Sequence, residues 1–271
     1  MIETPKIFRP QINTAYPSGN IPIFEEWFYE RFDNFISERE YLPIFWTSYL
    51  VNNFYASTSK EVPQLQQYVD NLDRSKKYFS LVQYDLGIVV DTKDLDILLF
   101  NMSENNGYPM PLICQPQPYK FNSKKEYFAN FIGNTTHQLR ESIESLIYKQ
   151  GYYISTQHHN IDKYCEIISK SLFTLCYRGF GANSFRIQEA IQYGSIPVYI
   201  SDEFIIPHNV PFETYGVVID AKDVYRVDEI LNAIPEIEII QKQDKLQEVF
   251  NNYYTYESNF ALIQKHLQNG T

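Results

Sequence analysis

In the stretch SLFTLCYRGFGANSFRIQEAIQYGSIPVYISD, residues 171–202, three of the charged residues lie around one junction of an expected strand, turn and helix. Arg178 follows an apolar run, while Arg186 and Glu189 follow a glycine-containing turn. A charged side chain is costly to bury unless a partner offsets that cost, so each of the three needs one. Guanidinium groups bind phosphate, and a carboxylate accepts hydrogen bonds from hydroxyl groups. These residue types therefore suit an anionic, hydroxyl-bearing ligand.

The turn between the two arginines favours the start of a helix. Gly179 and Gly181 lie in the turn, and Ser184 is a good N-cap for a helix that begins at Phe185. A helix N-terminus presents free N–H groups and the positive end of the helix dipole, which suits phosphate. Arg186 in the first turn opposes that dipole unless an anion lies there.

Glu189 lies on the same helix face as Arg186, three residues later. A diphosphate at the turn and a ribose along the helix would give both residues a partner. The competing interpretation is a salt bridge between them, worth a few tenths of a kcal/mol. GFGANS lacks the third glycine of the dinucleotide fingerprint, and no Gly-Lys-Ser/Thr follows as in a P-loop. On these residues alone, both interpretations stay open.

Strands and helices alternate along the chain that must position these residues. Strands are expected at 6–10, 42–51, 78–87, 96–100, 111–114, 127–134, 152–155, 172–178, 196–201 and 215–220. Helices are expected at 23–39, 62–72, 136–151, 161–171 and 184–194, followed by a mostly helical tail over 227–267 that is interrupted at Pro235. This alternation predicts parallel sheets covered on both faces. The QPQP segment at 115–118 predicts a linker between two α/β domains, with a cleft between them.

Composition excludes several classes of protein. Hydrophobic residues make up 44% of the 271-residue chain, which excludes a disordered protein. A formal charge of −10 disfavours nucleic acid and anionic membranes as partners, so an anionic ligand needs a local basic pocket. The three cysteines, Cys114, Cys165 and Cys176, are far apart and predict buried thiols in a reducing compartment. No signal peptide or membrane-spanning run is visible, which predicts a cytoplasmic location.

The segment LCYRGFGANSFRIQEAIQYGSIPVYISD resembles the signature of the exostosin-like glycosyltransferases, approximately C-x-R-G followed by S-F-R-x-x-E-A-x-x-x-G-x-I-P-V-x-x-S-D. The segment FANFIGNTTHQLRESI is similar to the family's glycine-ended strand and the helix after it. YLPIFWTSYL is similar to its apolar N-terminal strand. In YFSLVQYDLG, Tyr84 stands where the family has a histidine. The resemblance is strong from Tyr127 to Asp220 and thin before Gln115.

The resemblance implies a GT-B fold, in which two Rossmann-like domains face each other across a cleft and the last helix returns to the first domain. The implied acceptor domain is 1–118 with a returning helix at about 253–269, and the implied donor domain is 119–252. The implied reaction moves a sugar from a UDP-sugar to a glycan hydroxyl with inversion and without a metal or other cofactor. The expected donor-binding residues are Arg178, Gly179, Gly181, Ser184, Phe185, Arg186 and Glu189, with Gly133, Asn134 and Arg140 at the first glycine turn as further candidates.

Xylose is the expected sugar, with galactose and glucuronic acid left open. The alternative is a non-catalytic glycan- or nucleotide-sugar-binding domain of the same fold. Many family members carry an N-terminal membrane anchor, which this chain lacks, and its first domain is short. These departures fit a compact, virus-encoded cytoplasmic member that is a monomer or a weak homodimer.

Displacement at the anomeric carbon needs a general base, expected in the first domain. No histidine precedes His137, so a base in this domain must be the carboxylate of an Asp or a Glu. Asp85 ends an expected strand at the edge where α/β sheets bind ligands, and Asp73 opens the loop before that strand. We expect both to reach the same edge, with Asp73 slightly favoured. Glu26 and Trp27 are expected to contact the acceptor, the indole by stacking on a sugar. Each acid can also be interpreted as a surface or capping carboxylate.

Two other motifs could suggest metal sites. The DLD sequence at 94–96 has the form of the metal-binding DxD of the other glycosyltransferase fold, but it precedes an apolar strand and is better interpreted as a solvated loop. His158 and His159 are adjacent, so their side chains diverge, whereas a zinc site needs convergent ligands.

Overall fold

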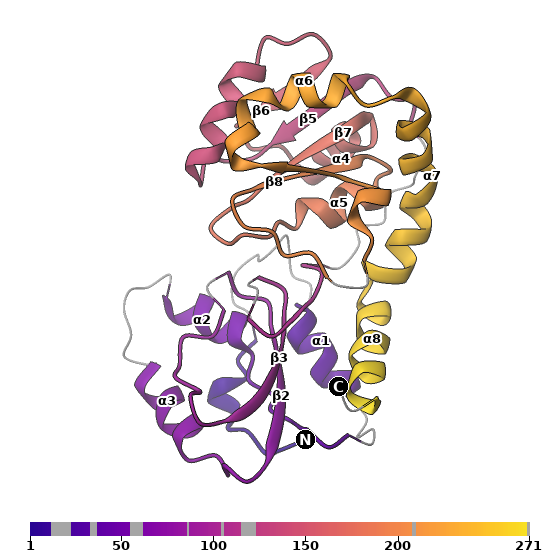
Figure 1. The fold of residues 1–271 in the computed structure, drawn as a ribbon. Coiled ribbons are helices and arrows are strands. Elements are labelled where there is room, and N and C mark those ends of the chain that lie inside the picture. Colours follow the sequence, from indigo (N-terminus) through magenta and orange to yellow (C-terminus); the bar gives the residue numbers. More distant parts are fainter. Residues whose placement is uncertain are drawn as a thin grey trace. The chain divides into compact units, whose positions relative to one another are not determined.

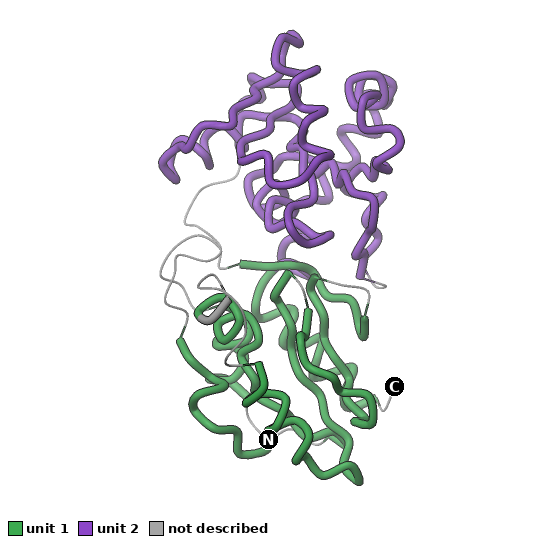
Figure 2. Tube along the Cα trace, turned by 90° about the vertical axis from the view of Figure 1, so that its left-hand side faces the viewer, with its two compact units in different colours: residues 1–115, 255–271 green, residues 116–254 purple. Residues whose placement is uncertain are grey.

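The computed structural model describes residues 1–11, 23–32, 37–54, 62–85, 87–103, 106–114, 123–207 and 210–269. The chain divides into two compact units, shown in different colours in Figure 2. Unit 1 comprises Met1–Gln115 and Thr255–Thr271, and unit 2 comprises Pro116–Tyr254. The predicted linker at 115–118 lies outside the described residues.

Unit 1 is built on a parallel four-stranded sheet in the order β1-β2-β3-β4. Its strands are β1 (Glu40–Tyr41), β2 (Lys77–Val82), β3 (Asp96–Asn101) and β4 (Tyr108–Pro109). Its helices are η1 (Lys6–Phe8), α1 (Phe24–Arg31), α2 (Trp46–Phe54), α3 (Val62–Asp70) and α8 (Tyr256–Gln268). In Figure 1, α2 and α3 lie on one side of β2 and β3, and α1 and α8 lie on the other.

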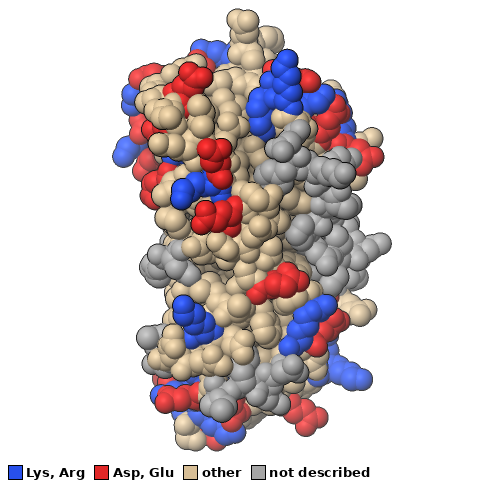
Figure 3. Space-filling view, turned by 90° about the vertical axis from the view of Figure 1, so that its right-hand side faces the viewer, with Lys and Arg blue, Asp and Glu red and all other residues tan. Residues whose placement is uncertain are grey.

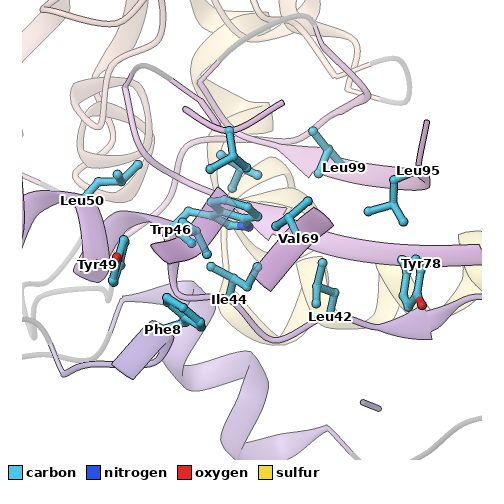
Figure 4. Packing of buried hydrophobic residues seen from close by; sticks show 13 residues of the cluster. Phe8, Leu42, Ile44, Trp46, Tyr49, Leu50, Val69, Tyr78, Leu95 and Leu99 are labelled. Carbon is cyan, nitrogen blue, oxygen red and sulfur yellow. The ribbon is translucent and has the colours of Figure 1, made fainter. Parts of the chain in front are cut away.

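The two faces of β2 have different partners because successive side chains of a strand alternate between faces. Tyr78 and Val82 belong to the cluster around Trp46, which also contains Leu65 and Val69 of α3 (Figure 4). Phe79, between them in sequence, packs on the opposite face against Phe28, Tyr41 and Phe100 in an aromatic layer. The sheet therefore needs helices on both faces, as predicted.

Unit 2 is built on a parallel five-stranded sheet in the order β6-β5-β7-β8-β9. The strands are β5 (Tyr127–Ile132), β6 (Tyr152–Ser155), β7 (Ser171–Tyr177), β8 (Ile196–Ser201) and β9 (Val217–Asp220). Helices α4 (Ile161–Ser169), α5 (Arg186–Gln192) and α7 (Glu236–Tyr253) form one connected layer against the sheet. The segments η2 (Gln138–Leu146) and η4 (Ala221–Arg226) pack together, with η2 against β6 and η4 against β8 and β9. The segments η3 (Phe212–Thr214) and α6 (Val227–Asn232) complete the unit.

The predicted α/β class is confirmed, with a parallel sheet in each unit and a last helix, α8, that belongs to unit 1 and packs on α1. A capping box of Thr255 and Ser258 starts α8 immediately after the boundary between the units. On the face of the molecule in Figure 3, acidic and basic residues lie interspersed. No helix in the described part of the chain is both long enough and apolar enough to cross a bilayer.

Several local predictions in unit 1 are wrong. The segment expected as a strand at 42–51 overlaps helix α2, which begins at Trp46. The expected strand at 6–10 contains the short helix η1, and 111–114 forms no strand. A strand was predicted at 42–51 because a short apolar run has no clear period and fits a strand as well as a buried helix. Its apolar residues Trp46, Tyr49 and Leu50 have helical spacing and enter one cluster. In unit 2, the helix expected at 136–151 is a 3-10 helix over Gln138–Leu146.

Two buried carboxylates of α1 hold the first turn of α2. Glu25 accepts hydrogen bonds from Thr47 N at 3.0 Å, Thr47 Oγ1 at 2.8 Å and Gln83 N at 2.9 Å. Glu26 accepts a hydrogen bond from Ser48 Oγ at 2.6 Å. Carboxylates stabilise the N-terminus of a helix by accepting from its free N–H groups. Glu25 thus joins α1, α2 and the end of β2.

Unit 1 should lose stability as the pH rises between about 4.5 and 8. Burial raises the pKa of Glu25 to about 8, although its hydrogen bonds favour the ionised form. The folded state therefore holds this proton more tightly, and its stabilising effect is complete below about pH 4.5 and lost as the pH rises to about 8. Glu25→Gln should flatten this dependence.

Tryptophan fluorescence in urea reports this transition, because both tryptophans, Trp27 and Trp46, lie in unit 1. Glu38→Gln is the control, since that side chain is exposed and forms a surface ion pair with Lys77. Parallel pH curves for the parent protein and Glu25→Gln would contradict the expectation.

Candidate functional site

The strand order of unit 2 places a switch in the direction of winding between β5 and β7. The chain passes from β5 outward to β6 and then crosses to β7 on the other side of β5. In open parallel sheets, ligands bind at the carboxyl ends of the strands where the direction of winding changes. Gly133 and Asn134 follow β5 there, and Arg178 and Gly179 follow β7. The fold thus brings the two predicted glycine turns together.

Arg186 extends from the first residue of α5 to the end of β5. Its Nη2 donates to the carbonyl oxygen of Ile132 at 2.5 Å, and its guanidinium lies 4.9 Å from the centre of the Phe131 ring. A Cβ added to Gly133 would lie 2.6 Å from Nη2, so the glycine makes room for the arginine. The buried Nε of Arg186 has no hydrogen-bond partner among the described residues.

Arg178 lies at the end of β7 and also keeps one unpaired donor. Its Nη1 pairs with Oδ1 of Asp202, and its Nη2 donates to the carbonyl oxygen of Phe180 at 3.2 Å. Its buried Nε has no partner in the described part of the chain. The hydrogen bond from Arg178 lowers the pKa of Asp202, which stays ionised at neutral pH. The site therefore contains two guanidinium groups, and the buried Nε of each has no hydrogen-bond partner among the residues that the structure describes.

Arg140, one of the weaker donor candidates, uses its guanidinium on the backbone. It donates to the carbonyl oxygens of Arg178 at 2.9 Å, Asn134 at 2.6 Å and Tyr177 at 3.2 Å. Burial, followed by the charge of Arg186, lowers the pKa of Arg140 to about 10, so it stays charged. Arg140 thus holds the ends of β5 and β7 together and supports both turns.

Glu189 is paired with a tyrosine. Tyr164 of α4 donates to Glu189 Oε2 at 2.5 Å. Among the ion pairs of the described residues, none joins Arg186 to Glu189 within 4.0 Å, so the simple salt bridge does not form. Burial raises the pKa of Glu189, while the hydrogen bond from Tyr164 and the charge of Arg186 oppose that shift.

The remaining predicted donor residues form the turn before α5. The helix begins at Arg186, one residue later than predicted, and Phe185 is its N-cap without a side-chain cap bond. Ser184 Oγ accepts from Arg186 N at 3.4 Å, a long bond. Gly181 and Ser184 are buried, whereas Phe180 between the two turn glycines is 66% exposed. The predicted donor set lacks Asp202, Tyr164 and Phe180. Asp202 closes the signature, but nothing in the sequence marked Tyr164.

In unit 1, the two predicted bases lie at opposite edges of the sheet. Asp85 follows the carboxyl end of β2, and burial raises its pKa to about 6. Asp73 precedes the amino end of β2, is exposed, and accepts hydrogen bonds from Ser75 N at 2.9 Å and Ser75 Oγ at 2.7 Å, which lower its pKa. The expectation that both reach one edge is wrong, because a loop that leads into a parallel strand lies at the amino edge. Asp73 caps a turn.

The predicted acceptor residues Glu26 and Trp27 are buried. Trp27 is 6% exposed and packs against Phe24, Tyr256 and Phe260. The carboxylate of Glu26 faces α2. An indole covered by α8 cannot stack on a sugar, so this prediction is wrong. Its partners in α8 lie more than two hundred residues away in the sequence.

The other motifs have ordinary structural partners. Asp96 begins β3 and pairs with Arg39 at 2.6 Å, at the amino edge of the sheet. His159 Nε2 lies 2.9 Å from Ser155 Oγ, and His158 is exposed. The three cysteines are buried free thiols, as predicted. Within the described ranges, no group of three or more His, Cys, Asp or Glu side chains could hold a metal ion.

About a third of the chain is similar to known proteins. Over 92 residues, the chain is 40% identical to a probable glucuronosyltransferase of Oryza sativa subsp. japonica and to the probable beta-1,4-xylosyltransferase IRX10L of Arabidopsis thaliana. These alignments cover 33% of this chain but only 21% and 22% of the relatives, about a fifth of their length.

Likeness to solved structures is weaker. TarM has a TM-score of 0.40 and 12% identity over 80% of this chain and 47% of TarM. A glycosyltransferase from Rickettsia africae ESF-5 has a TM-score of 0.40 and 11% identity over 77% of this chain and 68% of that one. The exostosin GT47 domain, in contrast, matches residues 88–234, more than half of the chain, and the chain therefore belongs to the exostosin GT47 family.

Proposed function

We propose that the chain is an inverting glycosyltransferase that moves a sugar from a UDP-sugar to a hydroxyl group of a glycan. The observation that carries this proposal is the pair of guanidinium groups, Arg178 and Arg186, at the switch point of unit 2. For the buried Nε of each, the described residues provide no hydrogen-bond partner. Buried donors are nearly always satisfied, so an anionic ligand is the natural partner of both.

The reaction needs the negative charge of the leaving UDP to be stabilised. As the bond between the anomeric carbon and the diphosphate oxygen breaks, charge develops on that oxygen, and Arg178 and Arg186 would stabilise it. We propose that this positive charge lets the enzyme work without a metal ion. Glu189 would accept hydrogen bonds from the ribose hydroxyls of the same donor.

The acceptor oxygen attacks the anomeric carbon from the face opposite to UDP, which inverts the configuration. A base takes the proton of that hydroxyl as the new bond forms. Asp85 is our candidate in unit 1, because with a pKa of about 6 it is mostly ionised at neutral pH and still able to accept a proton. Glu26 and Trp27 have no part in the proposal.

For the donor sugar we propose xylose. The names of the relatives support a pentose or a uronic acid, since one is a probable xylosyltransferase and another a probable glucuronosyltransferase. We therefore expect UDP-xylose to be used best, with UDP-glucuronic acid second. The competing hypothesis is a non-catalytic binding domain of the same fold, which would bind a nucleotide-sugar without turnover.

The purified protein should release UDP from UDP-xylose in the presence of xylo-oligosaccharides, and EDTA should not change the rate. A coupled assay for UDP measures this release, and calorimetry with UDP measures binding in parallel. Complete loss of turnover in EDTA would refute the metal-free mechanism. Binding of UDP-sugars without turnover on any acceptor would support the non-catalytic alternative, and absence of UDP binding would remove the donor site itself.

A further inference from the structure

Tyr164 joins helix α4 to the carboxylate of Glu189 on α5. Its hydroxyl donates to Oε2 at 2.5 Å, and the positive charge of Arg186 lies beside the same hydroxyl. Nothing in the sequence of the turn or of α5 indicates this contact, because Tyr164 is 25 residues before Glu189. The tyrosine thus contacts Glu189, which is proposed to hold the ribose, and lies near Arg186, which is proposed to hold the diphosphate.

The ring of Tyr164 is held by packing, which makes its hydroxyl a fixed donor. It packs against the cluster of Cys165, Ile168 and Tyr193, which is closed by a hydrogen bond from Cys165 Sγ to the Tyr193 hydroxyl at 3.1 Å. Helix α4 is itself anchored where Lys125 Nζ donates to the carbonyl oxygens of Ser169 at 2.8 Å and Gly194 at 2.7 Å. Cations near the C-terminus of a helix stabilise it.

The contact leaves half of the Glu189 carboxylate available. Oε2 accepts from Tyr164, whereas Oε1 accepts no hydrogen bond from any residue within the described ranges. A carboxylate has about four acceptor positions, so a side chain fixed through one of them can still accept from two neighbouring hydroxyl groups. Without its tyrosine partner, the carboxylate could rotate among several side-chain conformers, and ordering it would cost binding free energy.

We propose that Tyr164 is a positioning residue that orients Glu189 toward the ribose 2′ and 3′ hydroxyls and so sets the preference for a ribonucleotide donor. This inference rests on the proposed function, in particular on Glu189 as the ribose acceptor. Tyr164 itself need not touch the donor.

Calorimetry with UDP and with 2′,3′-dideoxy-UDP tests the inference, because only the first carries the two hydroxyl groups. The parent protein should prefer UDP by about tenfold or more, the value of a charge-assisted hydrogen bond. Tyr164→Phe keeps the ring and removes the hydroxyl. This variant should reduce the preference for UDP by about threefold to tenfold. The binding of UDP should weaken, whereas the affinity for the dideoxy analogue should change little.

Tyr152→Phe is the matched control. The Tyr152 hydroxyl also donates to a carboxylate of unit 2, Asp228 Oδ1 at 3.1 Å, but Tyr152 begins β6 at the amino edge of the sheet. This variant should keep the full preference for UDP. If Tyr164 had a merely structural role, its substitution would weaken the binding of both nucleotides equally and leave the ratio of the two affinities unchanged.

The outcomes separate the two levels of the proposal. If the parent protein prefers UDP and Tyr164→Phe keeps the same preference, Glu189 remains the ribose acceptor and the role of Tyr164 is refuted. If the parent protein binds both nucleotides equally, the assignment of Glu189 to the ribose fails, and the inference about Tyr164 fails with it.

Discussion

Asp85→Asn should lower the rate of sugar transfer by about 100-fold or more and leave UDP affinity unchanged. The amide keeps the size of the side chain but cannot accept the acceptor's proton. Asp85 is placed for this role at the carboxyl edge of β2, and burial rather than a charged neighbour raises its pKa to about 6. Transfer by the parent protein should therefore slow as the pH falls through about 6, where the carboxylate becomes protonated.

Asp73→Asn is the matched control for this experiment. The two acids lie before and after the same strand, but Asp73 is exposed at the amino edge, where its carboxylate accepts hydrogen bonds from Ser75. Transfer rate and UDP affinity should both stay at the parent values in this variant. Parent-level transfer by Asp85→Asn would show that the base lies elsewhere or that the protein supplies none, and a selective loss in Asp73→Asn would reverse the assignment.

Arg186→Ala should weaken UDP binding more than tenfold, because a charge-assisted hydrogen bond to the diphosphate is lost. The substitution also removes the donor to the carbonyl oxygen of Ile132, so we expect a loss of stability of about 1–3 kcal/mol. Calorimetry with UDP gives the first effect. Thermal unfolding followed by circular dichroism gives the second and shows whether the variant is folded at the temperature of the assay.

Gly133→Ala should disturb the hydrogen bond between Arg186 and the carbonyl oxygen of Ile132 without removing the charge of Arg186. The new Cβ would lie 2.6 Å from Arg186 Nη2, so the guanidinium must move away from the end of β5. UDP binding should weaken in this variant also. Arg226→Ala removes an arginine of the same unit that is exposed and paired with Asp223 and Glu229, and it should leave UDP affinity unchanged. Normal UDP affinity in both folded site variants would refute the assigned pocket.

The sequence by itself determined the class of the fold and the two turns that form the candidate site. Helices α3 and α4 fall where the helical spacing of their apolar residues predicted them, and the strands β5 to β9 fall close to the short apolar runs between turns and helices that predicted them. The glycine turns after β5 and β7 were also readable, since they combine turn residues with charged residues that need partners. The helix α2 was not, because a short apolar run fits a strand and a buried helix equally well.

The tertiary structure decided which of these residues meet. Gly133 and Arg186 are far apart in sequence, and they adjoin only because β5 lies beside β7 in the sheet. Tyr164 reaches Glu189 only because α4 and α5 pack side by side. By its residue type Trp27 is suited to stack on an acceptor sugar, but in the structure it packs against Tyr256 of α8. Such contacts depend on strand order and on packing between residues far apart in the sequence. Neither can be recognised from the periodicity or the composition of the segments that take part.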